Sequence, residues 1–252
     1  MDGIRQALDR SWSLMEEKGL KPIYSSVKGS VLYELPGTHT DIDIRSVFLY
    51  PTGEILSINK PPHTVEVMEG TLDYVGWEAE RFFHHLLKHN GTMVEMLQVP
   101  EKYALFGDQG LALRGIATKF VTKHLQDYYR GYARSQFKRS QQQIRTGKGA
   151  IYTYREMYAG IWLMRTGETI FPWPELRERI EGEGLYRSTV VAEMNMDRTK
   201  IDEGILDRMR GEFDELNVVL DAAVEASPLP AEYDGYETCN NLLLHWRSAG
   251  WR

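Results

Sequence analysis

The spacing of apolar residues changes near the middle of the chain, and this change constrains the fold more than any other feature. Between residues 22 and 77, short segments rich in β-branched and aromatic residues resemble strands. From about Gly110 onward, apolar residues recur at helical spacing. Strands separated by little helix favour an α+β sheet over a doubly wound one. We therefore expect an α+β fold: a small mixed sheet with flanking helices in residues 1–108, then an α-helical region in residues 109–252.

The first element is predicted to be an amphipathic helix, because Ile4, Leu8, Trp12 and Met15 recur at helical spacing before Gly19. Strands are expected at residues 22–28, 41–50, 64–68 and 71–77. Helices are expected near residues 82–90 and 93–97, then at 111–125, 127–145, 150–166, 174–183 and 202–226, with breaks at Gly147, Gly149 and Gly167.

The composition is that of an ordinary soluble globular protein, with 42% hydrophobic and 26% charged residues among 252. No segment approaches the roughly 18 apolar residues of a membrane helix, and the N-terminus lacks the apolar stretch of a signal peptide. The single Cys239 excludes an internal disulfide and suits a reducing compartment. These features predict a cytoplasmic protein with no membrane partner.

Charge is unevenly distributed along the chain, although its net value is −6. Residues 114–148 hold nine Lys and Arg against one acid, whereas residues 175–237 hold 17 acids against seven bases. A basic stretch of this kind is either a solvated helix face or a surface that faces phosphates. The sequence leaves both interpretations open.

Two aspartates in the second expected strand are the main candidates for chemistry. Residues two apart in a strand point to the same face, so Asp41 and Asp43 are expected to lie side by side while Ile42 and Ile44 face the core. Two adjacent carboxylates repel each other unless a cation lies between them. Ligation by oxygen alone suits a hard ion such as Mg²⁺. Asp-x-Asp also occurs by chance in many proteins, so the pair needs further support.

That support comes from the order of the surrounding residues. Gly29 and Ser30 follow the first expected strand, and the acidic strand begins some eleven residues later. A glycine lets the backbone approach a phosphate closely, and the Ser30 hydroxyl and nearby amides can donate hydrogen bonds to it. The Gly29-Ser30 turn is therefore a candidate site for the phosphates of a nucleoside triphosphate.

This order resembles the active-site motif of the DNA-polymerase-β-like nucleotidyltransferases, and especially a bacterial and phage group of which some members are associated with RNA ligases. The matching blocks are Gly29-Ser30-Val31-Leu32-Tyr33-Glu34-Leu35, Thr40-Asp41-Ile42-Asp43-Ile44-Arg45-Ser46-Val47, Asp73-Tyr74-Val75-Gly76-Trp77-Glu78, Asn90-Gly91 and Glu95-Met96-Leu97, and a weaker match continues through Gly131-Tyr132-Ala133, Lys148 and Arg155. The resemblance covers most of residues 24–167. Glu34, Thr40, Ser46 and Gly91 depart from the group's pattern, and none of them replaces a metal ligand.

The resemblance implies a third metal-binding carboxylate on a later strand. Asp73 falls where the group carries that acid, and Glu78 is the alternative, at an expected helix start. Lys148 and Arg155 fall where the group carries basic residues, so we expect both to contact the triphosphate. His85 and His89 stand at zinc-ligand spacing, but no third or fourth ligand is near, which favours a solvated or core-edge position.

The expected activity is a Mg²⁺-dependent transfer, with Mn²⁺ as a possible substitute. A nucleoside triphosphate such as ATP would donate its nucleoside monophosphate to an acceptor hydroxyl, with Asp41, Asp43 and Asp73 as catalytic and metal-binding residues. The acceptor could be RNA, protein or a small molecule. Two alternatives remain: a non-catalytic nucleotide-sensing or antitoxin-like module, and an accessory protein that binds RNA ends through residues 114–148.

Overall fold

The computed structural model describes residues 2–35, 41–141, 147–186, 188, 190 and 200–248. The chain forms two compact units, and each is assembled from separate stretches of sequence. The first comprises residues 1–32, 40–120 and 233–252, and the second comprises residues 33–39 and 121–232. The first unit therefore extends past residue 108, and it also includes the last helix. Within the described chain, no helix has both the length and the apolar character needed to cross a membrane.

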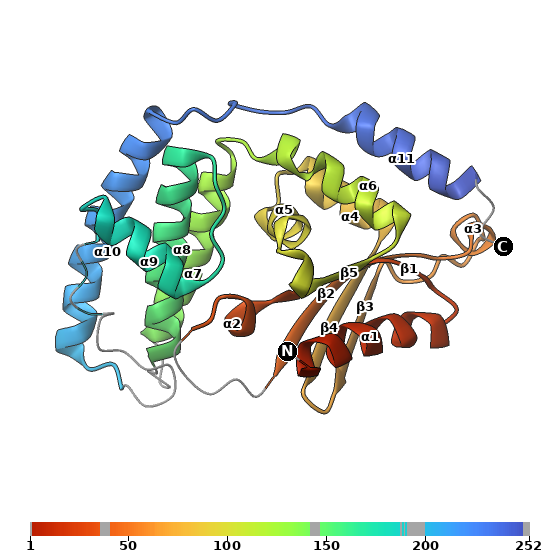
Figure 1. Ribbon diagram of the computed structural model, residues 1–252, viewed down its shortest axis with the longest axis horizontal. Helices are drawn as coiled ribbons and strands as arrows, with labels where there is room; N and C mark the ends of the chain where they lie inside the picture. The colour runs from red at the N-terminus through yellow and green to blue at the C-terminus, as the bar shows by residue number, and fades with distance from the viewer. Residues whose placement is uncertain are drawn as a thin grey trace. The chain divides into compact units, whose positions relative to one another are not determined.

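The first unit contains a five-stranded mixed sheet (Figure 1). Its order is β3-β4-β2-β1-β5, with β2 and β4 parallel and the other neighbours antiparallel. The strands are β1 (Lys21–Lys28), β2 (Ile42–Leu49), β3 (Thr64–Glu69), β4 (Leu72–Glu78) and β5 (Ala104–Phe106). The α+β prediction is confirmed, as are the four strands expected from the sequence.

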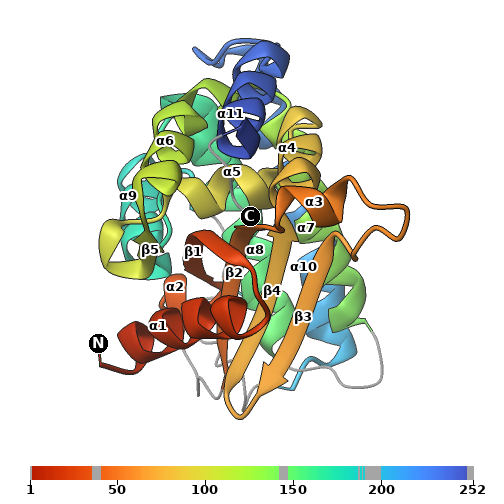
Figure 2. The ribbon, with the colours of Figure 1, turned by 90° about the vertical axis from the view of Figure 1, so that its right-hand side faces the viewer.

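Helices cover both faces of this sheet (Figure 2). Neighbouring residues of β1 show the two sides. The Ser11 hydroxyl of α1 (Asp2–Glu17) bonds that of Ser25 at 3.0 Å, whereas the Tyr24 hydroxyl donates to the carbonyl of Met96 in α5 (Gly91–Gln98) at 2.5 Å. The predicted first helix is confirmed as α1, and α11 packs on α4. The helices of this unit are α1 (Asp2–Glu17), α2 (Gly29–Leu32), α3 (Thr52–Ile55), α4 (Ala79–Leu87), α5 (Gly91–Gln98), α6 (Asp108–Ala117) and α11 (Tyr236–Ser248), with 3₁₀ turns at Glu101–Tyr103 and Thr118–Phe120.

The second unit is helical in its described residues (Figure 1). Its helices are α7 (Leu125–Ser140), α8 (Gly147–Thr166), α9 (Trp173–Gly182) and α10 (Glu203–Glu225). The central helix is α8, which packs against the other three and is buried along almost its whole length. An α-helix buried on all sides is apolar around its circumference, which explains why its sequence shows only weak amphipathic character.

Several local predictions are wrong, for reasons of packing. A break is expected at Gly147 and Gly149; α7 and α8 are indeed separate helices and α8 begins at Gly147, but Gly149 lies within α8. A Cβ on Gly149 would come within 3.1 Å of the Gln136 carbonyl oxygen, so glycine here lets α8 approach α7 closely. The helix expected at 111–125 ends at Ala117 and continues as a 3₁₀ turn. Neither β5 nor α11 was predicted.

Candidate active site

Strand pairing places two of the three predicted carboxylates next to each other. In the parallel pair of β2 and β4, Asp43 stands directly opposite Asp73. Opposed residues of neighbouring strands project from the same face of the sheet, so these side chains are neighbours although 30 positions separate them. Asp41 directly precedes β2 and is exposed. All three predicted acids therefore lie at or just before the first residues of two adjacent strands, β2 and β4.

The guanidinium of Arg45 bridges the two opposed carboxylates. Its Nη2 lies 3.2 Å from Oδ1 of Asp43, and its Nη1 lies 3.3 Å from Oδ1 of Asp73. Nη1 also donates to the backbone carbonyls of Ile44 at 3.0 Å and Asp73 at 3.1 Å. Arg45 shares the face of β2 that carries Asp43, because the two are two residues apart in one strand. Arg45 lies within the matching motif block, but the sequence alone does not indicate this bridging role.

Asp43 restricts position 29 to glycine. The φ of Gly29 is +75°, a left-handed conformation that side chains rarely adopt, and it starts α2 directly after β1. A Cβ at this position would lie 2.3 Å from Oδ2 of Asp43, so no other residue fits without moving that carboxylate. Ser30 follows in the same turn, half-buried. The structure thus brings the predicted phosphate turn and the predicted acids together.

A buried ion pair borders the same site and was not predicted from the sequence. Lys28, the last residue of β1, stands opposite Asp43 in the antiparallel register. Its Nζ lies 3.5 Å from Oε2 of Glu95 in α5, and Glu95 is only 4% exposed. Removing a carboxylate from water is costly unless a cation accompanies it. The sequence held one indication of this pair: Lys28 directly precedes the motif block that begins at Gly29, and Glu95 begins another block.

Glu78, the alternative third carboxylate, lies at the other end of β4. It stands opposite Phe48 and is fully buried. Its side chain caps α4 by accepting a hydrogen bond from the amide of Glu80 at 2.7 Å, and it also pairs with Arg247 of α11. This carboxylate is therefore engaged in holding two helices.

Lys148 and Arg155 both belong to α8, in the second unit. Lys148 is exposed in the first turn, whereas Arg155 is fully buried. Arg155 lies 2.9 Å from Oε1 of Glu156, and its guanidinium stacks on the ring of Tyr33 at 3.6 Å from the centroid. Although the two residues are seven positions apart on one helix, burial separates them: only Lys148 has its side chain at the surface.

Within the described chain, no group of three or more His, Cys, Asp or Glu side chains is arranged to hold a metal ion, and this finding covers the three predicted aspartates as well as His85 and His89. His89 instead ends α4 with a φ of +52°. The amide of Asn90 bonds the carbonyl of His85, and that of His89 bonds Leu86, as in other left-handed helix ends.

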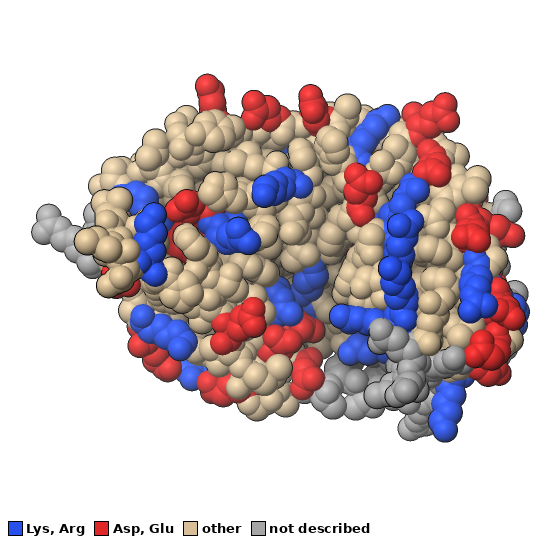
Figure 3. Space-filling view, turned by 180° about the vertical axis from the view of Figure 1, so that it is seen from behind, with Lys and Arg blue, Asp and Glu red and all other residues tan. Residues whose placement is uncertain are grey.

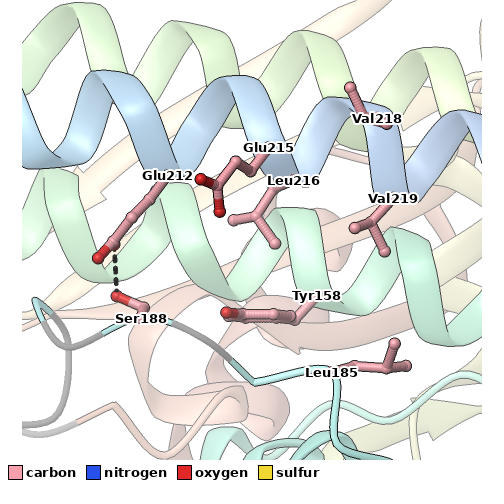
Figure 4. A pocket seen from close by; sticks show the side chains of 8 residues that line it. All are labelled: Tyr158, Leu185, Ser188, Glu212, Glu215, Leu216, Val218 and Val219. Atoms are coloured by element: carbon pink, nitrogen blue, oxygen red, sulfur yellow. Dashed lines mark hydrogen bonds between the residues drawn. The ribbon is translucent and has the colours of Figure 1, made fainter.

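A separate cavity of about 270 Å³ lies in the second unit (Figure 4). Its wall is mainly apolar, and Tyr158 lies across from Leu216 and Val219 of α10. Glu212 is the carboxylate at one end, where it accepts hydrogen bonds from Ser188 at 2.8 Å and from Tyr154. These internal bonds account for Glu212 without a ligand.

Comparison with known proteins identifies the family of this chain. The family described as RNA repair pathway DNA polymerase beta family matches residues 4–245. The chain belongs to this family. An uncharacterized protein of the archaeon Methanocaldococcus jannaschii is 26% identical over 216 residues, covering 82% of this chain and 86% of that protein. The RNA repair pathway DNA polymerase beta family match confirms the resemblance drawn from the motif blocks, and it supports a role of the nucleotidyltransferase kind.

Proposed function

We propose that the protein is a Mg²⁺-dependent nucleotidyltransferase that moves a nucleoside monophosphate from a nucleoside triphosphate to an acceptor hydroxyl. The observation that carries this proposal is the register pairing of Asp43 with Asp73, beside Asp41 and the Gly29 turn. These donors are oxygen atoms, which suit a hard divalent cation. Because Gly29 lacks a Cβ, which would lie 2.3 Å from Oδ2 of Asp43, the predicted phosphate turn and this carboxylate adjoin each other.

The chain's own residues divide the work in the proposed reaction. Asp41 and Asp43 hold the cation, which supplies charge neutralisation on the triphosphate when bound. Gly29 and Ser30 donate hydrogen bonds to the phosphates. The Asp73 carboxylate takes the proton of the acceptor hydroxyl, and the hydroxyl oxygen forms a bond to the α-phosphorus. The bond from that phosphorus to the bridging oxygen breaks, and pyrophosphate leaves.

Lys148 remains a proposed phosphate contact, whereas Arg155 needs a rearrangement for that role. The Arg155 guanidinium is buried and already pairs with Glu156, so a phosphate cannot contact it in this conformation. In the proposed enzyme, Arg155 therefore stabilises the helical unit by its stacking on Tyr33. The surface position of Lys148 is compatible with a flexible cation that follows a polyphosphate.

RNA is the acceptor that we propose. The family description points to an RNA repair pathway, and α7 carries exposed bases that suit a phosphate backbone. Arg134, Lys138 and Arg139 are exposed, and none of them forms an ion pair with another described residue. In the view of Figure 3, Lys and Arg side chains form a column on one face of the molecule. An RNA-binding accessory without transfer activity would use the same bases.

One labelling experiment tests the transfer. The protein is incubated with each of four α-labelled nucleoside triphosphates, MgCl₂ and RNA with free hydroxyl ends, and the label is followed on a gel. Covalently labelled RNA supports both the reaction and the acceptor, and labelled protein would replace RNA as the acceptor. Retention of RNA without any label would favour the accessory function.

The carboxylates are tested by the variants Asp43→Asn and Asp73→Asn. Each should lower the transfer rate at saturating Mg²⁺ by at least about a hundredfold, because each removes a charged contact made to the reacting groups. Asp214→Asn is the matched control, since Asp214 is an exposed acid on α10. Activity above about a tenth of wild type in either active-site variant would contradict the role proposed for that carboxylate.

A further inference from the structure

Arg45 occupies the space between the two opposed carboxylates in a well-anchored position. Four contacts hold its terminal nitrogens: one oxygen each from Asp43 and Asp73, and the two backbone carbonyls of Ile44 and Asp73. The Arg45 side chain is only 18% exposed, against 30% and 32% for the side chains of the two acids. The backbone contacts fix the guanidinium in place, so both carboxylates turn toward a cation that the chain itself supplies.

The two oxygens of Asp43 therefore face different surroundings. Oδ1 lies against Arg45, and Oδ2 lies next to the Cα of Gly29, where a Cβ would approach it to 2.3 Å. Asp73 also directs its Oδ1 to Arg45. One side of the Asp43 carboxylate thus faces the phosphate turn, and the other faces a guanidinium shared with Asp73.

We propose that Arg45 occupies the place of a second divalent cation, so that the site takes one cation readily and a second only when the guanidinium moves away. This inference rests on the proposed function for the identity of the first cation site. A cation ligated by Oδ1 of Asp43 and Oδ1 of Asp73 would meet the positive charge of Arg45 at the oxygens that both need. Like charges at such separations repel strongly in a partly buried site. Arg45 is therefore a positioning residue, which keeps the two acids together until the second cation replaces it.

The charge balance of the site supports this role. Asp41, Asp43 and Asp73 bring three negative charges to the ends of two adjacent strands, and Lys28 is paired with the buried Glu95. Arg45 is the cation whose described contacts reach both Asp43 and Asp73. Without a bound metal, the guanidinium lowers the repulsion between these two carboxylates. A second metal ion bound between them would lower the same repulsion in place of the guanidinium.

The test measures cation binding rather than transfer. The full-length protein is titrated with MnCl₂ alone in a calorimeter, and its thermal unfolding is followed with and without MnCl₂. The variant Arg45→Met removes the guanidinium but keeps an extended side chain. Arg10→Met is the matched control, because Arg10 bridges Glu17 and Glu69 at the surface of the same unit.

In the wild type we expect one Mn²⁺ to bind more tightly than the next. Arg45→Met should bind the second Mn²⁺ at least about tenfold more tightly. It should also melt at a lower temperature than the wild type without Mn²⁺, and gain more from Mn²⁺. Arg10→Met should titrate as the wild type does. Should Arg45→Met fail to fold, Arg45→Lys keeps the charge but cannot bridge both acids, and a smaller tightening of the second site is expected.

Unchanged or weaker binding of the second Mn²⁺ in both Arg45 variants would overturn the inference while leaving the proposed function standing. Absence of Mn²⁺ binding in every variant would overturn both the inference and the metal site. If Arg45→Met binds the second Mn²⁺ more tightly but the wild type transfers no nucleotide, the role of Arg45 would stand and the proposed function would be refuted.

Discussion

Gly29 shows how a single residue links backbone conformation to the candidate site. Two independent constraints act on it: a φ of +75°, and the Oδ2 of Asp43 in the space where a Cβ would stand. Gly19, at the end of α1, has a similar φ of +70° but nothing within 4 Å of its virtual Cβ. The two glycines therefore separate the cost of the left-handed conformation from the cost of the contact.

Substitution of each glycine by alanine should give different results. Gly19→Ala should lower the free energy of unfolding by about 1 kcal/mol and leave nucleotide transfer unchanged, because only the conformation is strained. Gly29→Ala should carry the same conformational cost and also displace the Asp43 carboxylate, so the transfer rate should fall at least about tenfold. Denaturant unfolding and the labelling assay measure the two effects. Equal activity of the two variants would show that the Gly29 contact with Asp43 has no role in transfer.

At the scale of elements, the last helix is tied to the sheet by one charged contact. Arg247, near the end of α11, pairs with Glu78 and donates to the carbonyl of Tyr50 at 2.8 Å. Trp246 packs beside Phe83 of α4, with the ring centroids 5.5 Å apart. Glu78 is fully buried, so its carboxylate depends on Arg247 and on the amide of Glu80 for compensation. The ion pair of Arg247 with Glu78 thus joins the last helix of the first unit to β4.

Loss of this pair should destabilise the first unit. Arg247→Met should lower the free energy of unfolding by roughly 3 kcal/mol, because it leaves a buried carboxylate without its cation. Cys239 in α11 offers a local reporter: burial raises the pKa of its thiol to about 12, so it should react slowly with thiol reagents at neutral pH. The variant should react faster as α11 detaches.

The control for this prediction is Arg165→Met. Arg165 and Glu183 are 3.6 Å apart at the surface, and both side chains are more than 40% exposed. An exposed pair contributes less than about 1 kcal/mol. If Arg247→Met destabilises the protein no more than this control, the Glu78 contact contributes little to stability.

At the scale of the whole molecule, an acidic protein carries a local excess of positive charge. The basic stretch of residues 114–148 contains two kinds of side chain. Arg114 donates to the carbonyl of Val99 at 2.8 Å and Arg130 pairs with Asp221, so these two bases are structural. The exposed bases of α7 remain for an external partner, which is the interpretation we adopt for RNA.

A triple substitution of Arg134, Lys138 and Arg139 by glutamine should weaken RNA binding. If each side chain contacts one phosphate of a single strand, the negative slope of log K against log salt should become shallower by about 2. The loss should be similar for RNAs of different sequence, because phosphate contacts carry no base information. Filter binding at several salt concentrations measures both quantities.

The matched control removes three exposed bases of the first unit, by the substitutions Lys18→Gln, Lys60→Gln and Lys88→Gln. This control changes the net charge equally. Equal loss of RNA binding in both triple variants would mean that net charge alone governs the interaction, and that α7 is a solvated helix face.

The residue pattern by itself determined four strands of the sheet and the first helix, because strand alternation and helical spacing are local properties. It also marked Asp41, Asp43 and Gly29 as candidate site residues. Only the tertiary structure placed Asp73 opposite Asp43, since a parallel register joins segments that share no local signal. It also decided that Glu78 is buried as a helix cap, that Arg155 is enclosed in α8 and that Arg45 bridges two acids. Burial and charge pairing depend on which distant elements pack around a side chain, and no short stretch of sequence records those neighbours.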